Sequence, residues 1–232
     1  AQPATDLIDD QEVALTGERY VPEEAVVYQC PVGFTDPQAE CRFDDLADIQ
    51  PDGPLRERER VRAVLHTDAG EVDCRTADCV FAVIGSDGRT VASVALAFDP
   101  DAPLKPPPVL TVTPSTGLVD GQTVVVEGEH FSSNWHGIIL ECPMDRQQDL
   151  DCGLDFDHVR FPIADATGRF RTTFEVAAEF RSNGETLDCR VDACALWSAF
   201  DYDDYNLAAA PLSFAADAMP ATPTAVTPAF TG

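Results

Sequence analysis

Residues 111–128 have the sequence Thr-Val-Thr-Pro-Ser-Thr-Gly-Leu-Val-Asp-Gly-Gln-Thr-Val-Val-Val-Glu-Gly, and part of this stretch recurs near the start of the chain. Leu118-Val-Asp-Gly-Gln-Thr-Val-Val-Val-Glu-Gly128 aligns with Leu7-Ile-Asp-Asp-Gln-Glu-Val-Ala-Leu-Thr-Gly17. Further along, Asp188-Cys-Arg-Val-Asp-Ala-Cys194 aligns with Asp73-Cys-Arg-Thr-Ala-Asp-Cys79. Self-similarity of this kind indicates that the chain consists of two related halves.

A proline-rich segment, Leu104-Lys-Pro-Pro-Pro108, separates the halves. Consecutive prolines favour an extended polyproline II conformation and are typical of semi-rigid spacers. We therefore predict a first domain over residues 1–103, a linker over 104–108, a second domain over 109–216 and a Pro/Thr-rich tail over 217–232.

Eight cysteines are arranged in the same order in both halves, one long pair followed by one short pair. An even number of cysteines favours disulfides in a secreted chain, and the simplest connectivity is four local bridges, two in each half. The alternative is two zinc sites of four cysteines each. Neither C-x2-C spacing nor a histidine beside the pairs supports that alternative. The cysteines are Cys30, Cys41, Cys74, Cys79, Cys142, Cys152, Cys189 and Cys194.

Short segments rich in β-branched and aromatic residues, bounded by turn residues, predict strands throughout both halves, and no long segment has helical periodicity. Asp87-Gly88 between two apolar runs predicts a hairpin. Six or seven short strands per half indicate tandem antiparallel sandwiches of the immunoglobulin type. The predicted strands outside that hairpin include residues 109–112, 122–126, 137–141, 158–163, 170–174, 193–200 and 207–214.

The charge balance of the 232 residues is strongly acidic, with 15 Lys+Arg against 41 Asp+Glu and a net charge of −26. Such a surface repels phosphate, which argues against nucleic-acid binding and against anionic membranes. No apolar run approaches the ~20 residues of a membrane helix, so we expect no membrane insertion of the mature chain. The start, Ala-Gln-Pro-Ala without Met, suits a secreted chain from which a signal peptide has been removed.

The motifs of residues 111–128, 188–194 and 212–214 resemble the neocarzinostatin family of enediyne apoproteins, and the first half resembles it through its copies of the later motifs. The resemblance implies a seven-stranded immunoglobulin-like sandwich from secreted, actinobacterial proteins that hold a hydrophobic enediyne chromophore in a cleft. It therefore predicts an extracellular or cell-surface protein. A small hydrophobic ligand is one possible partner, and a carrier of such a molecule is one candidate function.

One feature departs from the family in both halves. A long hairpin ahead of the second cysteine pair walls the family's cleft, whereas here the connections are only residues 67–70 in the first half and 177–184 in the second. A carrier must bury most of its ligand, so these short walls weigh against a retained chromophore site. Aromatic side chains that could line a residual pocket, or that could simply belong to the core, are Trp135, Phe156, Phe180 and Trp197.

The second half begins with an apolar segment, residues 109–112, that has no counterpart ahead of Leu7. The first domain is therefore predicted to lack its first strand, and an uncovered sheet edge invites pairing with another chain. Within the tail, Thr224-Ala-Val-Thr-Pro228 resembles Leu110-Thr-Val-Thr-Pro114. Our first hypothesis is a head-to-tail homopolymer, an extracellular filament in which the tail donates a strand to the next subunit. The candidate donor residues are Thr224, Ala225, Val226, Thr227, Pro228, Ala229 and Phe230.

The tail has a second interpretation, a flexible stalk on a cell-wall-anchored adhesin module, because Ala229-Phe-Thr-Gly232 faintly resembles a sortase sorting signal. Catalysis has little support, since neither a G-x-S-x-G elbow nor an H-E-x-x-H motif occurs and oxidised cysteines provide no thiolate. We expect no enzyme activity, no cofactor and no metal. Weak calcium candidates, chosen because calcium prefers oxygen ligands on loops, are Asp149, Asp151, Asp201 and Asp203.

Overall fold

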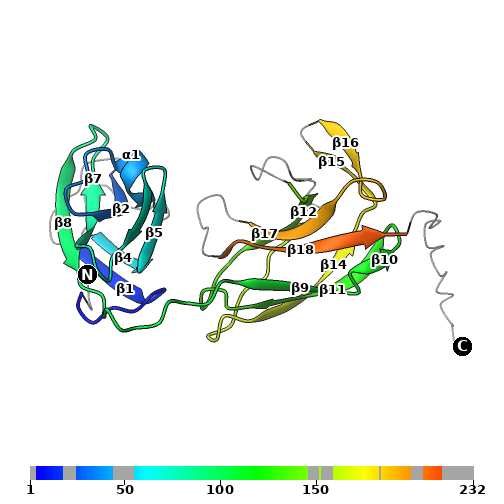
Figure 1. Cartoon of the computed structure of the whole chain (residues 1–232), viewed down its shortest axis with the longest axis horizontal. Coiled ribbons are helices and arrows are strands. Elements are labelled where there is room, and N and C mark those ends of the chain that lie inside the picture. The colour runs from blue at the N-terminus through cyan, green and yellow to red at the C-terminus, as the bar shows by residue number, and fades with distance from the viewer. Residues whose placement is uncertain are drawn as a thin grey trace, which may run out of the picture. The chain divides into compact units, whose positions relative to one another are not determined.

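The computed structural model describes residues 4–17, 25–43, 55–145, 152, 159–182, 184–199 and 206–215. The chain divides into two compact units, unit 1 over Ala1–Lys105 and unit 2 over Pro106–Gly232. Regular structure in both units is almost entirely β-strand, which confirms the predicted all-β, immunoglobulin-like class (Figure 1). Among the described residues, no helix has the length and apolar character needed to cross a membrane.

Unit 2 is built from two main sheets and a projecting hairpin (Figure 1). The larger sheet has the strand order β10-β18-β17-β12-β13, the smaller has the order β14-β11-β9, and β15 pairs with β16. The strands are β9 (Val109–Thr113), β10 (Thr116–Leu118), β11 (Gln122–Glu129), β12 (Ile138–Pro143), β13 (Val159–Arg160), β14 (Phe170–Val176), β15 (Glu179–Ser182), β16 (Glu185–Asp188), β17 (Cys194–Ala199) and β18 (Ala208–Phe214).

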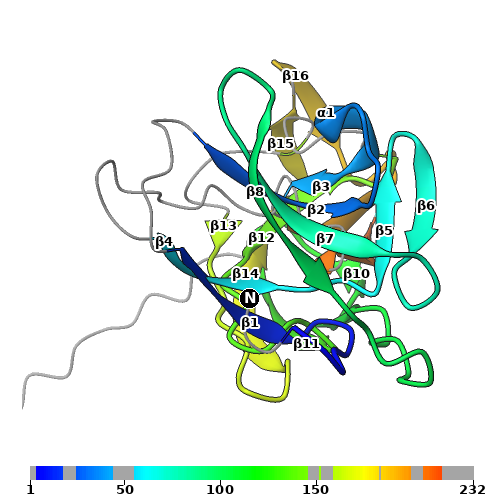
Figure 2. The ribbon, with the colours of Figure 1, turned by 90° about the vertical axis from the view of Figure 1, so that its left-hand side faces the viewer.

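Unit 1 has a four-stranded sheet in the order β3-β2-β7-β8, a two-stranded sheet β1-β4 and a hairpin β5-β6 at one side (Figure 2). A single helical turn, α1 (Pro37–Glu40), begins after Asp36, whose side chain accepts a hydrogen bond from the Gln38 backbone N–H. The strands are β1 (Glu12–Gly17), β2 (Val26–Pro31), β3 (Arg42–Phe43), β4 (Leu55–Arg60), β5 (Val64–Thr67), β6 (Gly70–Asp73), β7 (Cys79–Ile84) and β8 (Thr90–Leu96).

The core of each unit lies between its sheets because alternate strand residues are apolar and point to one face. In unit 2, Val124 and Val126 of β11 are buried against residues of the larger sheet such as Leu196. Unit 1 repeats this arrangement with Val13 and Leu15 of β1.

All four predicted local disulfides are present. They leave no free cysteine in the described structure, so the zinc alternative is wrong. Each unit has one bridge across 10 or 11 residues and one across five. The pairs are Cys30–Cys41, Cys74–Cys79, Cys142–Cys152 and Cys189–Cys194. Disulfides of this density are typical of extracellular proteins.

The repeat extends to backbone conformation. Gly117 and Gly121 have φ values of 64° and 70°, and Asp6 and Asp10, at the same repeat positions, have φ values of 53° and 64°. Positive φ is accessible to glycine and is tolerated by Asp. The backbone therefore has positive φ at these two repeat positions in both units, although the residue types differ.

The two units differ at one sheet edge. In unit 2, strand β11 pairs with β14 on one side and with β9 on the other. In unit 1, the equivalent strand β1 pairs with β4, and no third strand joins this sheet among the described residues.

Of two local predictions, one agrees with the structure in full and the other only in part. The hairpin at Asp87-Gly88 is confirmed, since β7 pairs with β8 and the Gly88 N–H donates to the Gly85 carbonyl at 2.8 Å. The strand expected over residues 158–163 is shorter, because regular pairing ends at Arg160 and Pro162 has no N–H for the ladder.

Candidate functional site

An apolar cluster covers the outer face of the larger sheet of unit 2, on the side away from the core. Along β12 the residues alternate, so Ile139 belongs to the core whereas Leu140 belongs to a separate cluster. Leu140 pairs across the sheet with Trp197 on one side and with Val159 on the other. We call this group the outer-face cluster; its members are Ile138, Leu140, Cys142, Cys152, Val159 and Trp197.

Two large apolar side chains are exposed just after the end of β13. They belong to Phe161 and Ile163, which follow the cluster residue Val159 in the chain. Their exposed fractions are 64% and 59%. His136 and Ile163 form an isolated antiparallel β-bridge, which keeps this segment beside the sheet. Exposed apolar side chains next to a buried apolar cluster are typical of ligand or partner sites.

The predicted pocket aromatics lie in different places. Trp135 is 8% exposed and packs in the core, with its ring centre 4.7 Å from that of Phe131. Phe180, on β15, packs against the same core from the side. Trp197 alone of the three belongs to the outer-face cluster. The fourth candidate, Phe156, lies outside the described residues.

Leu140, Val159 and Phe161 did not stand out from the sequence as candidate site residues. Each lies in a segment that was predicted to be a strand from its β-branched and aromatic content. Within such a segment, period-2 alternation was the available signal for which face a residue occupies. Alternation alone does not say which face is the core, so these residues could not be separated from core residues.

The β15–β16 hairpin is held at its base by two carboxyl groups. The backbone N–H of Ala177 donates to Glu141 Oε2 at 2.9 Å, and that of Ala178 donates to Asp120 Oδ1 at 2.8 Å. Glu141 is 2% exposed, and burial raises its pKa to about 8. The hydrogen bond from Ala177 opposes this shift, while the negative charge of Asp120 adds to it.

Unit 1 has an equivalent but smaller outer face. Its cluster also surrounds the long disulfide, Cys30–Cys41, and includes Tyr28 and Ala82. Ala82 occupies the repeat position of Trp197, so the outer face of unit 1 lacks the large indole ring at this point.

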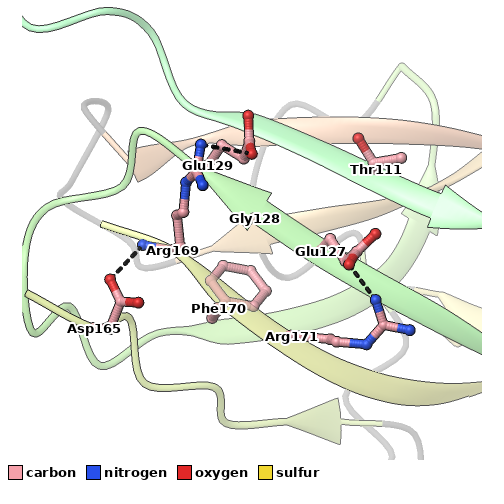
Figure 3. Close-up of a pocket in the computed structure, with 8 residues that line it drawn as sticks. All are labelled: Thr111, Glu127, Gly128, Glu129, Asp165, Arg169, Phe170 and Arg171. Carbon is pink, nitrogen blue, oxygen red and sulfur yellow. Dashed lines mark hydrogen bonds and ion pairs between the residues drawn. The ribbon is translucent and has the colours of Figure 1, made fainter. Parts of the chain in front are cut away.

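The outer face of the smaller sheet of unit 2 carries a shallow hollow of about 410 Å³ (Figure 3). Both of its guanidinium groups are paired: Arg171 bonds to Glu127, and Arg169 lies 3.1 Å from Glu129. Because these cations already have carboxylate partners, the hollow offers little to an anionic ligand. The residues that line it are Thr111, Glu127, Gly128, Glu129, Asp165, Arg169, Phe170 and Arg171.

The described residues contain no group of three or more His, Cys, Asp or Glu side chains placed to hold a metal ion. The calcium candidates Asp149, Asp151, Asp201 and Asp203 lie outside the described residues, as do the donor-strand residues 224–230.

These features define a disulfide-linked immunoglobulin-like sandwich with an apolar outer face. Residues 110–214, which make up most of the second unit, match the model of the Neocarzinostatin family. The model matches this one stretch, and the relation of unit 1 to it depends on the internal repeat.

Solved structures similar to part of the chain include macromomycin and apokedarcidin. Macromomycin is 26% identical with a TM-score of 0.40, and the match covers 47% of this chain and 99% of macromomycin. The solution conformation of apokedarcidin is 21% identical with a TM-score of 0.35, covering 46% of this chain and 96% of that one. No curated protein has significant sequence similarity to the chain.

Proposed function

We propose that unit 2 is a non-enzymatic carrier of a small, largely apolar, aromatic molecule, which binds on the outer face of the larger sheet. The observation that supports this most is the apolar cluster around the partly buried Trp197 on the face of the sheet away from the core, together with the exposed Phe161 that follows the cluster residue Val159 in the chain. The family relationship supports it as well, since neocarzinostatin-family relatives are carriers of enediyne chromophores.

The physical basis is apolar burial. A ligand that covers exposed apolar side chains gains about 25 cal/mol for each Å² removed from water. Aromatic rings add about 0.5–1.5 kcal/mol for each well-placed ring pair. Trp197 and Phe161 can supply such pairs, and the net charge of −26 favours a neutral or cationic ligand over an anionic one.

The test is a titration of the full chain with the neutral fluorescent probe N-phenylnaphthylamine. We expect saturable binding, and we expect Phe161→Ser to weaken it by about tenfold, equivalent to about 1.4 kcal/mol. Val191→Ser is the matched control, because Val191 is 81% exposed and lies outside the outer-face cluster. Equal weakening of probe binding by both variants, or no weakening by either variant, would contradict the proposed site.

A second candidate function is assembly by strand addition, in which residues 224–230 pair with strand β1 of another copy. The described structure supports it through one observation: β1 has β4 as its sheet partner, whereas β11 has both β14 and β9. Deletion of residues 220–232 should then convert polymers into monomers in light scattering. Polymers of unchanged size would reject this candidate.

The extracellular location is consistent with the four disulfides. An actinobacterial source, attachment to a cell surface and an adhesin role stay predictions.

A further inference from the structure

The two units place different residues at one equivalent, buried position. Gln29 precedes Cys30 on β2, and Glu141 precedes Cys142 on β12. Their side chains are 0% and 2% exposed. The position is therefore inside both units, but only unit 2 has an ionisable group there.

Both polar atoms of the Gln29 side-chain amide form hydrogen bonds with the backbone of a single residue. Its Nε2 donates to the Arg62 carbonyl at 2.7 Å, and its Oε1 accepts from the Arg62 N–H at 2.8 Å. Arg62 lies just ahead of the β5–β6 hairpin, and Asp9 Oδ1 accepts from the next N–H, that of Ala63, at 2.9 Å. Gln29 and Asp9 thus hold the base of that hairpin.

Unit 2 repeats this arrangement with one hydrogen bond missing. Glu141 Oε2 accepts from Ala177, and Asp120 accepts from Ala178, at the repeat positions of Arg62 and Ala63. The other oxygen, Glu141 Oε1, is buried and has no hydrogen-bond partner in the described part of the chain. An ionised carboxylate can only accept, whereas a protonated one also donates a hydrogen bond, as the amide of Gln29 does.

We propose that Glu141 is a neutral carboxylic acid whose Oε1–H donates to the Ala177 carbonyl, so that it positions the β15–β16 hairpin as Gln29 positions β5–β6, and that loss of this proton loosens the hairpin. Glu141 is then a positioning residue for the β15–β16 hairpin. The consequence for ligand binding rests on the proposed carrier function; the protonation and the hairpin geometry do not.

The electrostatic environment supports the neutral form. Burial is the main cause that raises the pKa of Glu141, and Asp120 faces it from the β10–β11 turn with a further negative charge. The cation on the neighbouring strand β13 is Arg160. Its guanidinium lies 5.7 Å from the centre of the Phe174 ring, and it is not among the causes of the pKa shift of Glu141. An unpaired buried charge is costly, so protonation relieves both the desolvation and the repulsion.

The pH dependence has a defined sign. With the hairpin closed, Glu141 holds its proton up to about pH 8; when the hairpin opens and the carboxyl is hydrated, its pKa returns to about 4.5. Between these values the closed form binds one more proton than the open form, so the opening constant rises about tenfold per pH unit and levels off above the upper value.

The experiment is residue-resolved NMR on the full chain. The Glu141 carboxyl ¹³C shift should titrate near pH 8 rather than near 4.5. The protection factor of the Ala177 amide, corrected for intrinsic exchange, should fall by about tenfold per pH unit between these values. A Glu141 carboxyl that titrates near 4.5 would overturn the proposal.

Two variants separate this role from a general packing role. Glu141→Gln supplies a permanent donor, so the Ala177 protection factor should become independent of pH while the fold is kept. The reciprocal Gln29→Glu should transfer the same pH dependence to the Arg62 amide and leave Ala177 unchanged. If Glu141→Gln keeps the wild-type pH profile, the proposal is wrong, whatever its effect on stability.

The link to ligand binding is measured separately with N-phenylnaphthylamine. Its affinity should decrease from about pH 5 to about pH 8 in the wild type and stay constant in Glu141→Gln. Absence of probe binding at every pH would contradict the carrier function alone, since the NMR titration does not use the probe. Binding with the same pH profile in both proteins would overturn the part of the proposal that concerns ligand affinity.

Discussion

At Gly128 the backbone of β11 lies directly against the ring of Phe170 (Figure 3). A Cβ atom at this position would lie 2.1 Å from a ring carbon, well inside van der Waals contact. Phe170 in turn packs against Phe131 and Trp135, with ring centres 5.0 and 5.9 Å apart. One missing side chain therefore makes room for an aromatic group that closes this end of the core.

Gly128→Ala should destabilise unit 2 by about 1–3 kcal/mol, because the Phe170 ring must move out of a packed core. Urea unfolding monitored by tryptophan fluorescence measures this, since both tryptophans of the chain lie in unit 2. The control is Glu129→Ala on the same strand, which removes an exposed ion pair worth less than about 1 kcal/mol. Equal effects of the two substitutions would contradict the packing argument.

At the same scale, Glu141→Gln should stabilise unit 2 by about 3 kcal/mol at pH 7, because the wild-type carboxyl must keep a proton that the unfolded chain releases. The pKa of Glu141 is raised in the folded state, so its favourable contribution is complete below about pH 4.5 and is lost as the pH rises toward about 8. The gain from Glu141→Gln should therefore grow over this interval. Denaturant unfolding at several pH values checks it, and a gain independent of pH would contradict it.

At the scale of elements, each unit joins its long disulfide to the outer face of its larger sheet. Cys142 and Cys152 are buried members of the outer-face cluster beside Leu140, and Cys30 and Cys41 have the same role in unit 1. The short disulfides instead begin directly after the β5–β6 and β15–β16 hairpins. In unit 2, the Cys189 N–H donates to the Ala178 carbonyl at 2.8 Å. The two kinds of bridge therefore stabilise different elements.

Replacing Cys142 and Cys152 together by Ala should cost unit 2 about 2–4 kcal/mol, since the unfolded chain is no longer constrained. It should also weaken probe binding, because these buried residues are part of the outer-face cluster that contains Trp197. The matched control is Cys30→Ala with Cys41→Ala, which should destabilise unit 1 and leave the tryptophan-monitored transition unchanged. A tryptophan transition altered equally by both double variants would mean that the units do not unfold independently.

At the scale of the whole molecule, the dominant property is charge. With 41 acidic and 15 basic residues, the chain repels itself in the folded state, and it also repels nucleic acids and anionic surfaces. The exposed ion pairs of the smaller sheet in unit 2, Arg169 with Glu129 and Arg171 with Glu127, offset only a small part of this repulsion.

Added salt should therefore raise the stability of both units, because at about 1 M salt the Debye length falls to about 3 Å and distant like charges no longer interact. Calorimetric transition temperatures measured at low and high sodium chloride test this. The opposite result, a lower transition temperature at high salt, would mean that the paired charges outweigh the net repulsion.

Much of the local structure followed from the sequence. The disulfide pairing could be predicted because partners five to eleven residues apart repeat in the same order, and short loops close at low entropic cost. The hairpin at Asp87-Gly88 followed from turn chemistry, and the all-β class followed from the short β-branched segments.

Tertiary structure alone decided which face each strand residue occupies. Trp135 and Trp197 are alike as sequence features, yet one closes the core and the other lies on the outer face, because each sheet face is assigned only when distant strands pair. The outer-face cluster joins alternate residues of β12 to Cys152, Val159 and Trp197, and Glu141 accepts its hydrogen bond from a backbone N–H 36 residues further along. Alternation supplies two equivalent faces, and only long-range packing makes one of them the core.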